Sequence, residues 1–301
     1  NLAQTASAAS ALHHSFRLPP LACGAAIAFL CVWIFRGGAR RLERFSVFVV
    51  PGASALFLLI CLLTLWRNAA HLPHALSAVF RDAFSFQSAA GGFFGSLFCR
   101  SVTAGFSRGI FSNEAGLGSA PLVHSLAQSS PNEQAVWGAR EVVLDTHVVC
   151  TLTALCILSS PVYLSGRFSA DTLCSAVFSE ALGESAANAF SVSLFFFAAA
   201  SIVAWGYYGL QALRFLSERR TAQALYLLLF FICSIFGATL AIPLVFTLSD
   251  VANLAMALPN LYALLRFRHE CRFPLPKTPK CLQFVHKSFS SYGKIDADEG
   301  E

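Results

Sequence analysis

Long apolar runs separated by short polar segments dominate the chain. A helix that crosses a bilayer needs about 20 mostly apolar residues. Stretches near that length lie at residues 21–35, 47–66, 92–126, 142–164, 190–216, 224–238 and 243–267, of which the first and sixth are short for a span. The pattern therefore predicts an all-α integral membrane protein with about seven transmembrane helices.

The composition strengthens this prediction. Hydrophobic residues make up 56% of the 301 residues and charged residues only 12%, and the mean hydropathy is +0.61. Soluble domains carry about 25% charged residues. So little charge cannot cover the surface of a soluble globule, and it argues against a disordered chain or a nucleic-acid binder. The partner that this composition predicts is the lipid bilayer, with no nucleic acid.

Basic residues between the apolar runs predict an orientation. They follow the first, fifth and seventh stretches, at Arg36, Arg40, Arg41 and Arg44, then Arg214, Arg219 and Arg220, then Arg266, Arg268, Arg272, Lys277 and Lys280. Cytoplasmic loops carry an excess of Lys and Arg. Seven spans put all three clusters on one side, with the amino terminus outside and the carboxyl tail inside a plasma membrane. An even number of spans would separate the third cluster from the others.

Three segments look peripheral to the membrane. Residues 67–90 read as an external connection with an interfacial helix, residues 165–186 as a second external loop, and residues 269–301 as a solvated cytoplasmic tail. The ten cysteines form no C-x-x-C pair and no zinc-like spacing. Those within apolar runs (Cys61, Cys150, Cys156 and Cys233) are expected to be small buried hydrophobic residues. His124 and His147 are expected to be packing or interfacial groups, with no metal ligands beyond a coupling ion.

The third stretch contains residues that a lipid-facing helix does not favour. From Ser107 it reads SRGIFSNEAGLGSAP. A charge at mid-membrane costs about 2.5–3.5 kcal/mol on insertion scales, and Gly costs about 1 kcal/mol relative to Ala inside a helix. Irregular backbone at membrane depth is tolerated only where protein buries it or where it lines a cavity. The segment therefore predicts a helix broken between Phe111 and Ser119.

A broken helix exposes free carbonyl groups at the end of its first half and free amides at the start of its second half. These ends suit the ammonium and carboxylate of a zwitterion, and unwound carbonyls also bind cations. Because Ala115, Gly116, Gly118 and Ala120 have little side chain, a small neutral amino acid fits best. The alternative, that small residues here only let two helices pack closely, leaves Asn113 and Glu114 unexplained.

This segment resembles the signature of the alanine-or-glycine:cation symporter family, the sodium:alanine/glycine symporters. Further stretches resemble other elements of that family over about residues 1–268: NLAQ, FQSAAGGFFG, LDTHVVCTLTAL, WGYYG and SDVANLAMALPNL. The resemblance implies a LeuT-like fold of two inverted five-helix repeats, with the seven spans as core helices four to ten. It implies sodium as the coupling ion and no cofactor.

The chain begins at Asn1 rather than Met and shows no signal segment. On the family template, the residues before Leu21 would be the end of core helix three. We therefore expect residues 1–268 to form a transporter core truncated at its amino terminus, without the family's first broken helix. Residues 269–301 would be the cytoplasmic tail.

The resemblance also implies a set of site residues. Those expected near the substrate are Gln4, Phe111, Ser112, Asn113, Gly116, Gly118, Ser119 and Trp205. Those expected near sodium are Asn113, Asp145, Thr146 and Ser201. The sequence departs from the family at Ala200, where a second hydroxyl is usual, and at Leu210, where an acidic residue is usual.

Other roles for these residues stay open at this point. Gln4 reads equally as a loop amide and Trp205 as a packing residue. Asp145 and Thr146, three or four residues inside the fourth span, could bind sodium or hold the broken helix through hydrogen bonds, and Asp145 also reads as an interfacial carboxylate. Glu114 is expected to tie the two half-helices together, through backbone or through Arg108. Asp250 and Asn253 are expected to be polar packing groups rather than ligands.

Four rival functions remain. One is a channel, although a single broken segment with polar ends on two sides suits a carrier better. The chain could be a non-transporting membrane fragment that keeps part of the fold, or a proton-coupled carrier if Ala200 weakens a sodium site. An intramembrane hydrolase would pair Ser119 with His124 or His147. Ser119 and His124 are five residues apart, so they diverge on one helix, and we expect no enzyme.

Overall fold

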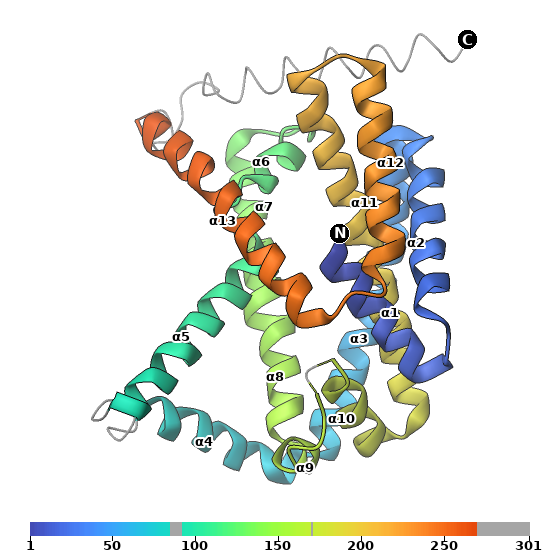
Figure 1. Ribbon diagram of the computed structural model, residues 1–301. Helices are drawn as coiled ribbons and strands as arrows, with labels where there is room; N and C mark the ends of the chain where they lie inside the picture. The colour runs from blue at the N-terminus through green and yellow to red at the C-terminus, as the bar shows by residue number, and fades with distance from the viewer. Residues whose placement is uncertain (85–91, 170, 270–301) are drawn as a thin grey trace. The chain divides into compact units, whose positions relative to one another are not determined.

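The computed structural model describes residues 1–84, 92–169 and 171–269, and within these ranges the regular secondary structure is helical. The chain separates into two compact units. The first comprises residues 1–98 and 149–247, and the second comprises residues 99–148 and those from 248 onward. The prediction of an all-α protein is confirmed (Figure 1).

The first unit holds most of the helices. They are α1 (Leu2–Phe16), α2 (Pro20–Phe35), α3 (Gly38–Arg67), the 3-10 turn η1 (Ala69–His71), α4 (Leu72–Phe84), α8 (Thr151–Leu158), α9 (Pro161–Leu164), α10 (Leu173–Leu182), α11 (Glu184–Leu216) and α12 (Arg220–Gly237). The second unit contains α6 (Ser119–His124), α7 (Pro131–Val142) and most of α5 (Gly92–Asn113), of the π-helical segment η3 (Val143–Cys150) and of α13 (Ile242–Phe267).

Five helical stretches are long and apolar enough to cross a membrane. They are α3, the continuous helix Pro131–Leu158 formed by α7, η3 and α8, then α11, α12 and α13. The apolar helices α2 and α10 are shorter. The predicted stretch 92–126 is divided between α5 and α6. By length and composition, five of the predicted spans are confirmed, and a total of seven stays a prediction.

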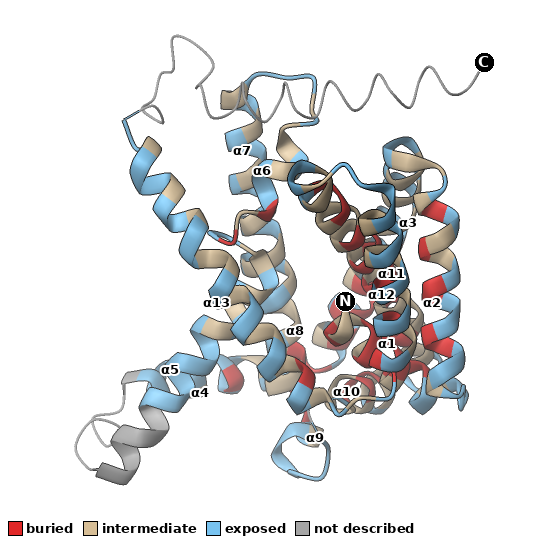
Figure 2. Ribbon diagram, turned by 45° about the horizontal axis from the view of Figure 1, so that its top comes forward, coloured by how far each residue is buried: buried red, intermediate tan, exposed pale blue. Residues whose placement is uncertain are grey.

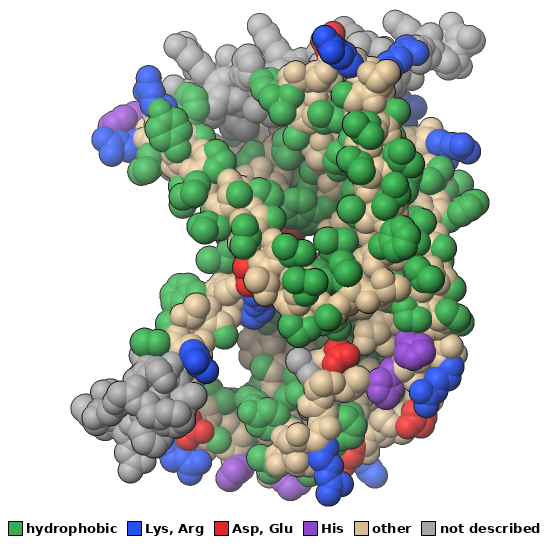
Figure 3. Space-filling model, in the orientation of Figure 1, with side chains coloured by type: hydrophobic (Ala, Val, Ile, Leu, Met, Phe, Trp, Pro, Cys, Tyr) green, Lys and Arg blue, Asp and Glu red, His purple; other side chains and the backbone are tan. Residues whose placement is uncertain are grey.

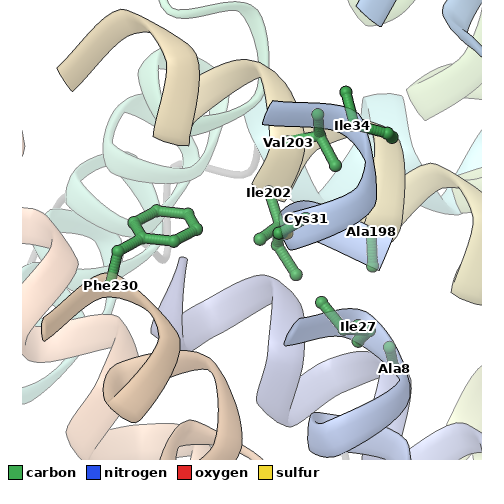
Figure 4. Close-up of a cluster of buried hydrophobic side chains, with 8 residues drawn as sticks. All are labelled: Ala8, Ile27, Cys31, Ile34, Ala198, Ile202, Val203 and Phe230. Carbon is green, nitrogen blue, oxygen red and sulfur yellow. The ribbon is translucent and has the colours of Figure 1, made fainter. Parts of the chain in front are cut away.

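Small and branched side chains build the core of the first unit. The long helix α11 packs against α1, α2, α3, α10 and α12. One buried cluster joins four of these helices, through Ala8, Ile27, Cys31, Ile34, Ala198, Ile202, Val203 and Phe230 (Figure 4). Close approach explains two glycines of the WGYYG motif. A Cβ on Gly206 would lie 2.4 Å from Phe35 Cζ, and one on Gly209 would lie 2.1 Å from the Tyr226 hydroxyl oxygen.

The amino-terminal NLAQ motif fixes α1 to α12. Asn1 Nδ2 donates to the Phe230 carbonyl at 3.1 Å, and Asn1 Oδ1 accepts from the Ser234 hydroxyl at 3.1 Å. Residues Leu2–Phe16 form helix α1, and their place at the end of a core helix of the family stays a prediction. Its Ala side chains at positions 3, 6, 8, 9 and 11 are buried. Such small residues let neighbouring helices approach closely in membrane proteins.

Two predicted helix boundaries were wrong because only apolar residues were counted. α3 begins at Gly38 rather than Val47, and thus includes the Arg-rich segment. Arg and Leu are good helix formers, and long basic side chains keep their charged ends at the membrane surface. The helix predicted at 142–164 runs over Pro131–Leu158. A capping box between Ser130 and Glu133, with Pro131 at the first position, starts it earlier.

The segments predicted as external connections are partly helical. Residues 67–90 contain α4, and residues 165–186 contain α10 and the start of α11. The membrane position of α4 stays a prediction. Two of the four cysteines expected to be buried, Cys150 and Cys233, are exposed, whereas Cys61 and Cys156 are buried. Most of the tail 269–301, and most of the FQSAAGGFFG motif, lie outside the described residues.

The exposed surface of the first unit is itself apolar. Large hydrophobic side chains such as Phe29 (81%), Phe48 (79%) and Leu216 (80%) are exposed. On the face of this unit drawn in Figure 3, hydrophobic side chains cover the middle, and charged or His side chains gather towards both ends. Isolated exposed hydrophobic residues are normal, but large contiguous patches mark a surface that needs a partner. Lipid is that partner for a chain with these apolar helices.

Candidate functional site

The predicted break in the third apolar stretch is present. α5 ends at Asn113 and α6 begins at Ser119, so the first half is two residues longer than expected. Between them the backbone has positive φ at Glu114 (54°), Gly116 (85°) and Gly118 (92°). Glycine adopts this region without steric cost, which explains both glycines. A non-glycine residue there is uncommon and, as at Glu114, is worth a functional explanation.

The second half of the break is shorter than predicted. α6 has six residues and ends at His124, rather than continuing to Leu126. Its third residue, Pro121, has no N–H, so fewer free amides face the break than an ordinary helix start would offer. Peptide groups of the interruption itself, rather than a long helix dipole, are therefore the polar groups available here.

Side chains of the break hold its turn together. Asn113 Oδ1 accepts from the Ala115 N–H at 2.9 Å, an arrangement typical of Asx turns. The Glu114 carboxylate accepts from the Ser119 hydroxyl at 2.7 Å, so it links the end of α5 to the start of α6. Glu114 was expected to tie the two halves through backbone or Arg108; Ser119 is a partner that the sequence did not suggest. Ser119 is 4% exposed.

The break meets the π-helical segment η3 through side-chain oxygens. The Ser112 hydroxyl donates to Asp145 Oδ2 at 2.5 Å, and Asn113 Nδ2 donates to Thr146 Oγ1 at 3.2 Å. Thr146 Oγ1 also lies 3.5 Å from Asp145 Oδ2. π-helical turns occur frequently at functional sites. The structure thus brings together Ser112, Asn113, Asp145 and Thr146, and the binding of sodium by these residues stays a prediction.

The position of Asp145 differs from the expectation. It was expected three or four residues inside its span, as an interfacial carboxylate, a sodium ligand or a group that holds the broken helix through hydrogen bonds, and the bond from Ser112 confirms the last of these. Asp145 lies instead in the middle of the helix Pro131–Leu158, because that helix starts earlier. Both Asp145 and Thr146 are half-buried. A carboxylate at mid-span marks a functional site by default in membrane proteins.

Helix α13 contacts α5 at one place and the break at another. Asp250, expected to be a packing residue, forms an ion pair with Arg108 of α5 and accepts from the Ser107 hydroxyl at 3.0 Å. Ten residues further along, Asn260 Nδ2 donates to the Gly116 carbonyl at 2.8 Å. Sequence reasoning missed Asn260. The signal was available, since an Asn after Pro259 in an apolar helix has poor helix propensity and needs a polar partner.

The remaining predicted site residues are less directly connected to the break. Phe111 lies in α5, where the Arg108 guanidinium carbon is 5.6 Å from its ring centroid. Gln4 lies on α1 and Ser201 and Trp205 on α11, all in the first unit. Ser201 and Trp205 are four residues apart and so share a helix face. The Trp205 ring packs against Tyr208, with centroids 5.9 Å apart.

The geometry does not assemble a hydrolase. The Ser119 hydroxyl donates to Glu114, while His124 Nδ1 lies 2.6 Å from Gln134 Oε1 on α7. His124 Nε2 is 3.8 Å from the Glu141 carboxylate. His147 is exposed on η3. His124 therefore joins α6 to α7, as a packing group, instead of acting on Ser119. No group of three metal-ligating His, Cys, Asp or Glu side chains occurs among the residues that the structure describes.

Comparisons with known proteins identify relatives that are named as transporters. The sodium/alanine symporter AgcS of Methanococcus maripaludis is 33% identical over 273 residues, which are 88% of this chain and 58% of the relative. The amino-acid carrier protein AlsT of Bacillus subtilis is 30% identical, over 87% of this chain and 55% of the relative. The probable sodium/glutamine symporter GlnT of Bacillus subtilis is 29% identical, over 88% and 55%.

The chain spans about half the length of these curated relatives. The family model of the sodium:alanine symporters matches residues 1–272, which include every predicted site residue. Members of this family are transporters and not enzymes. On this match, the chain belongs to the sodium:alanine symporter family.

Proposed function

We propose that this protein is a secondary active symporter that imports a small neutral amino acid, alanine or glycine, together with sodium. The observation that carries the proposal is the break at residues 114–118, whose flanking residues Ser112 and Asn113 hydrogen-bond to Asp145 and Thr146 of η3. An interrupted apolar helix with convergent oxygens is the arrangement by which carriers of several folds bind substrate and ion.

Sodium binding would use the oxygens at the junction of the break and η3. The Asp145 carboxylate supplies the negative charge, and Asn113, Thr146 and the Ser112 hydroxyl supply neutral oxygens of the type that hard cations prefer. Ser201 on α11 stays the remaining residue that is predicted for sodium. Since Ser112 and Asn113 end α5 while Asp145 and Thr146 belong to η3, a cation held by both restrains the break. A substrate bound to the break then gains affinity from the cation, and the reverse holds by linkage.

The substrate would bind the polar peptide groups of the break. The small side chains of Ala115, Gly116, Gly118 and Ala120 favour a substrate with a small side chain. Phe111, Ser112, Asn113 and Ser119 flank these groups, and Gln4 and Trp205 stay predicted substrate residues. The relatives named as alanine and glutamine symporters belong to the same family, so the size of the substrate is the property that most needs a direct measurement.

Coupling to one sodium ion supplies enough free energy. A cation crossing about 100 mV releases about 2.3 kcal/mol, and a tenfold gradient adds about 1.4 kcal/mol. A zwitterion has no net charge and gains nothing from the membrane potential by itself. Co-transport with one cation therefore permits accumulation of several hundredfold.

The proposal includes a LeuT-like fold in the plasma membrane, with the amino terminus of the chain outside and the carboxyl tail inside. The Arg-rich α2–α3 and α11–α12 connections lie at the same end of the first unit (Figure 1). This agreement supports a cytoplasmic location for that end under the positive-inside rule. With that end in the cytoplasm, α3 and α12 run away from the cytoplasm along the chain, and α11 runs towards it.

Uptake of radiolabelled alanine tests the proposal. The chain is expressed alone and, separately, preceded by the amino-terminal part of the M. maripaludis symporter, in cells deficient in alanine uptake. We expect alanine uptake in medium that contains sodium, and we expect it to disappear when choline replaces sodium. Uptake that persists in choline and is abolished by a protonophore would favour proton coupling, the candidate that Ala200 supports. Lack of uptake by both proteins, when both reach the membrane, would favour a non-transporting protein.

A further inference from the structure

Asn260 contacts the break from a different helix than the predicted site residues do. Its Nδ2 donates to the Gly116 carbonyl at 2.8 Å, and a Cβ on Gly118 would lie 3.1–3.3 Å from the Oδ1, Cγ and Cβ atoms of Asn260. The two glycines adjoin Leu117, which is buried at 3% exposure. The side chain of Asn260 therefore contacts the interruption on both sides of a buried anchor.

The hydrogen bond from Asn260 to the Gly116 carbonyl offsets two energetic costs. Gly116 belongs to neither α5 nor α6, so its carbonyl has no place in a helical ladder. An unsatisfied backbone carbonyl at membrane depth is costly. Asn is a poor helix former and costly in a membrane span, yet Asn260 stands inside the apolar α13, in its carboxyl-terminal half. Both costs are offset when its amide satisfies the Gly116 carbonyl.

The contact with Asn260 fixes the orientation of the peptide groups in a segment whose glycines have left-handed backbone conformations. Gly116 and Gly118 have φ of 85° and 92°, and glycine also adopts other conformations readily. Without a restraint, the peptide groups on either side of Leu117 would sample several orientations. A hydrogen bond to one carbonyl, and close packing against the second glycine, select one of them.

We propose that Asn260 is a positioning residue that fixes the peptide groups of the break in the orientation that binds the amino acid. This inference rests on the proposed function, and Asn260 acts through Gly116 and Gly118 rather than by touching the substrate. Asp250, about 15 Å away along α13 at 1.5 Å per residue, separately holds α5 through Arg108. The two contacts of α13 thus have different tasks: one holds the helix, and the other shapes the binding groups.

The first test compares Asn260→Ala with the control Asn253→Ala, which removes the same side chain from the same helix. The proteins are purified, reconstituted in liposomes and assayed for alanine uptake. Loss of one positioning hydrogen bond is expected to raise the alanine KM about tenfold with the maximal rate within about twofold. The control is expected to leave both unchanged. A KM for Asn260→Ala equal to that of the control would overturn the inference.

The second test separates the hydrogen bond from packing. Asn260→Asp preserves shape but, when ionised, has no donor for the Gly116 carbonyl; when protonated, it regains one O–H donor. An aspartate carboxyl is ordinarily ionised above pH 5, so at pH 7 the KM of Asn260→Asp is expected to be raised at least as far as that of Asn260→Ala. A KM within twofold of the parent would show that packing alone is sufficient, and this result would overturn the inference.

A third measurement does not depend on transport. Hydrogen–deuterium exchange of the peptide covering residues 111–121 reports the local restraint directly. Exchange is expected to rise at least tenfold in Asn260→Ala, with α12 unchanged and with no rise in Asn253→Ala. If the parent protein takes up no alanine, the proposed function fails and this measurement still decides on Asn260. Unchanged exchange at 111–121 would refute the positioning role even in an active transporter.

Discussion

The two units of the molecule are stabilised in different ways. The first has buried clusters of apolar side chains, which join α1, α2, α11 and α12 at one place and α3, α8, α10 and α11 at another. In the second, among the described residues, only Leu117 and Ser119 are buried. Figure 2 shows the same contrast, with buried residues concentrated in α1, α2 and α11 and few in α5, α7 and α13.

The apolar helices of the two units show what this difference means. In α11, 50% of the most apolar 18-residue window is buried, whereas in α13 the share is 6%. Both windows have similar hydropathy, 1.8 and 1.5. Helices of the second unit contact one another through polar groups around the break: Arg108 with Asp250, Asn260 with Gly116, and Ser112 with Asp145. We infer that apolar packing stabilises the first unit, whereas hydrogen bonds and ion pairs stabilise the second unit.

The largest expected effect is on the packing of the first unit. Phe178 is 1% exposed and its ring centroid is 5.0 Å from that of Phe190. Phe178→Ala is expected to lower the free energy of unfolding by about 3–5 kcal/mol, because a buried ring leaves a cavity. The matched change in the second unit, Leu254→Ala at 62% exposure, is expected to cost less than about 0.5 kcal/mol. Loss of helix content in an SDS titration measures both, and equal losses would contradict the contrast.

A smaller but still large effect is expected at Asp145, where the second unit carries its charge at mid-span. Asp145→Asn keeps the shape and the acceptor for Ser112 but removes the charge. The sodium concentration for half-maximal uptake is expected to rise about 100-fold, which corresponds to about 2.7 kcal/mol. Asp82→Asn, on the exposed surface of α4, is the control. A sodium dependence unchanged in Asp145→Asn would remove this carboxylate from the proposed cation site.

The sequence predicted the break better than it predicted the lengths of helices. Asn113, Glu114 and the glycines are locally incompatible with a lipid-facing helix, so their pattern alone locates the interruption. The start of the helix at Pro131 depends on a capping box in a polar segment, which hydropathy does not detect. The Asn after Pro259 in an apolar helix signals that Asn260 needs a polar partner, but the partner is a backbone carbonyl 144 residues away, and no local pattern identifies it. Which apolar faces are covered by protein also depends on tertiary packing.

A moderate effect is expected for the ion pair of the second unit. Arg108 and Asp250 side chains are 42% and 40% exposed, so solvent weakens their attraction. A double-mutant cycle with Arg108→Gln and Asp250→Asn is expected to give a coupling energy of about 0.5–1 kcal/mol that falls in 1 M salt. Hydrogen exchange at residues 99–113 provides the free energies. A coupling above about 2 kcal/mol that ignores salt would indicate that lipid or protein covers the pair.

The smallest expected effect concerns a polar contact of the packed unit. Asp171 lies outside the proposed spans and accepts from the Ser169 hydroxyl at 2.5 Å and the Ser10 hydroxyl of α1 at 3.0 Å. These bonds, Ser169 first, together with the nearby His14, hold the pKa of the Asp171 carboxyl below its ordinary value, against the opposing effect of partial burial. A carboxyl whose pKa is lowered by folding stabilises the folded state at pH values above its unfolded pKa. That stabilisation is lost as the pH falls through the lowered pKa.

Asp171→Asn is therefore expected to lower the unfolding free energy by only a few tenths of a kcal/mol at pH 7, after allowance for its exposure. The difference from the parent should shrink towards pH 2.5, where the parent carboxyl is protonated as well. Thermal unfolding in detergent at both pH values measures it, with Asp82→Asn as the exposed control. A loss of unfolding free energy at pH 7 as large as that expected for Phe178→Ala would contradict this prediction. It would mean that the hydrogen bonds of Asp171, and not the apolar clusters, hold α1 in the first unit.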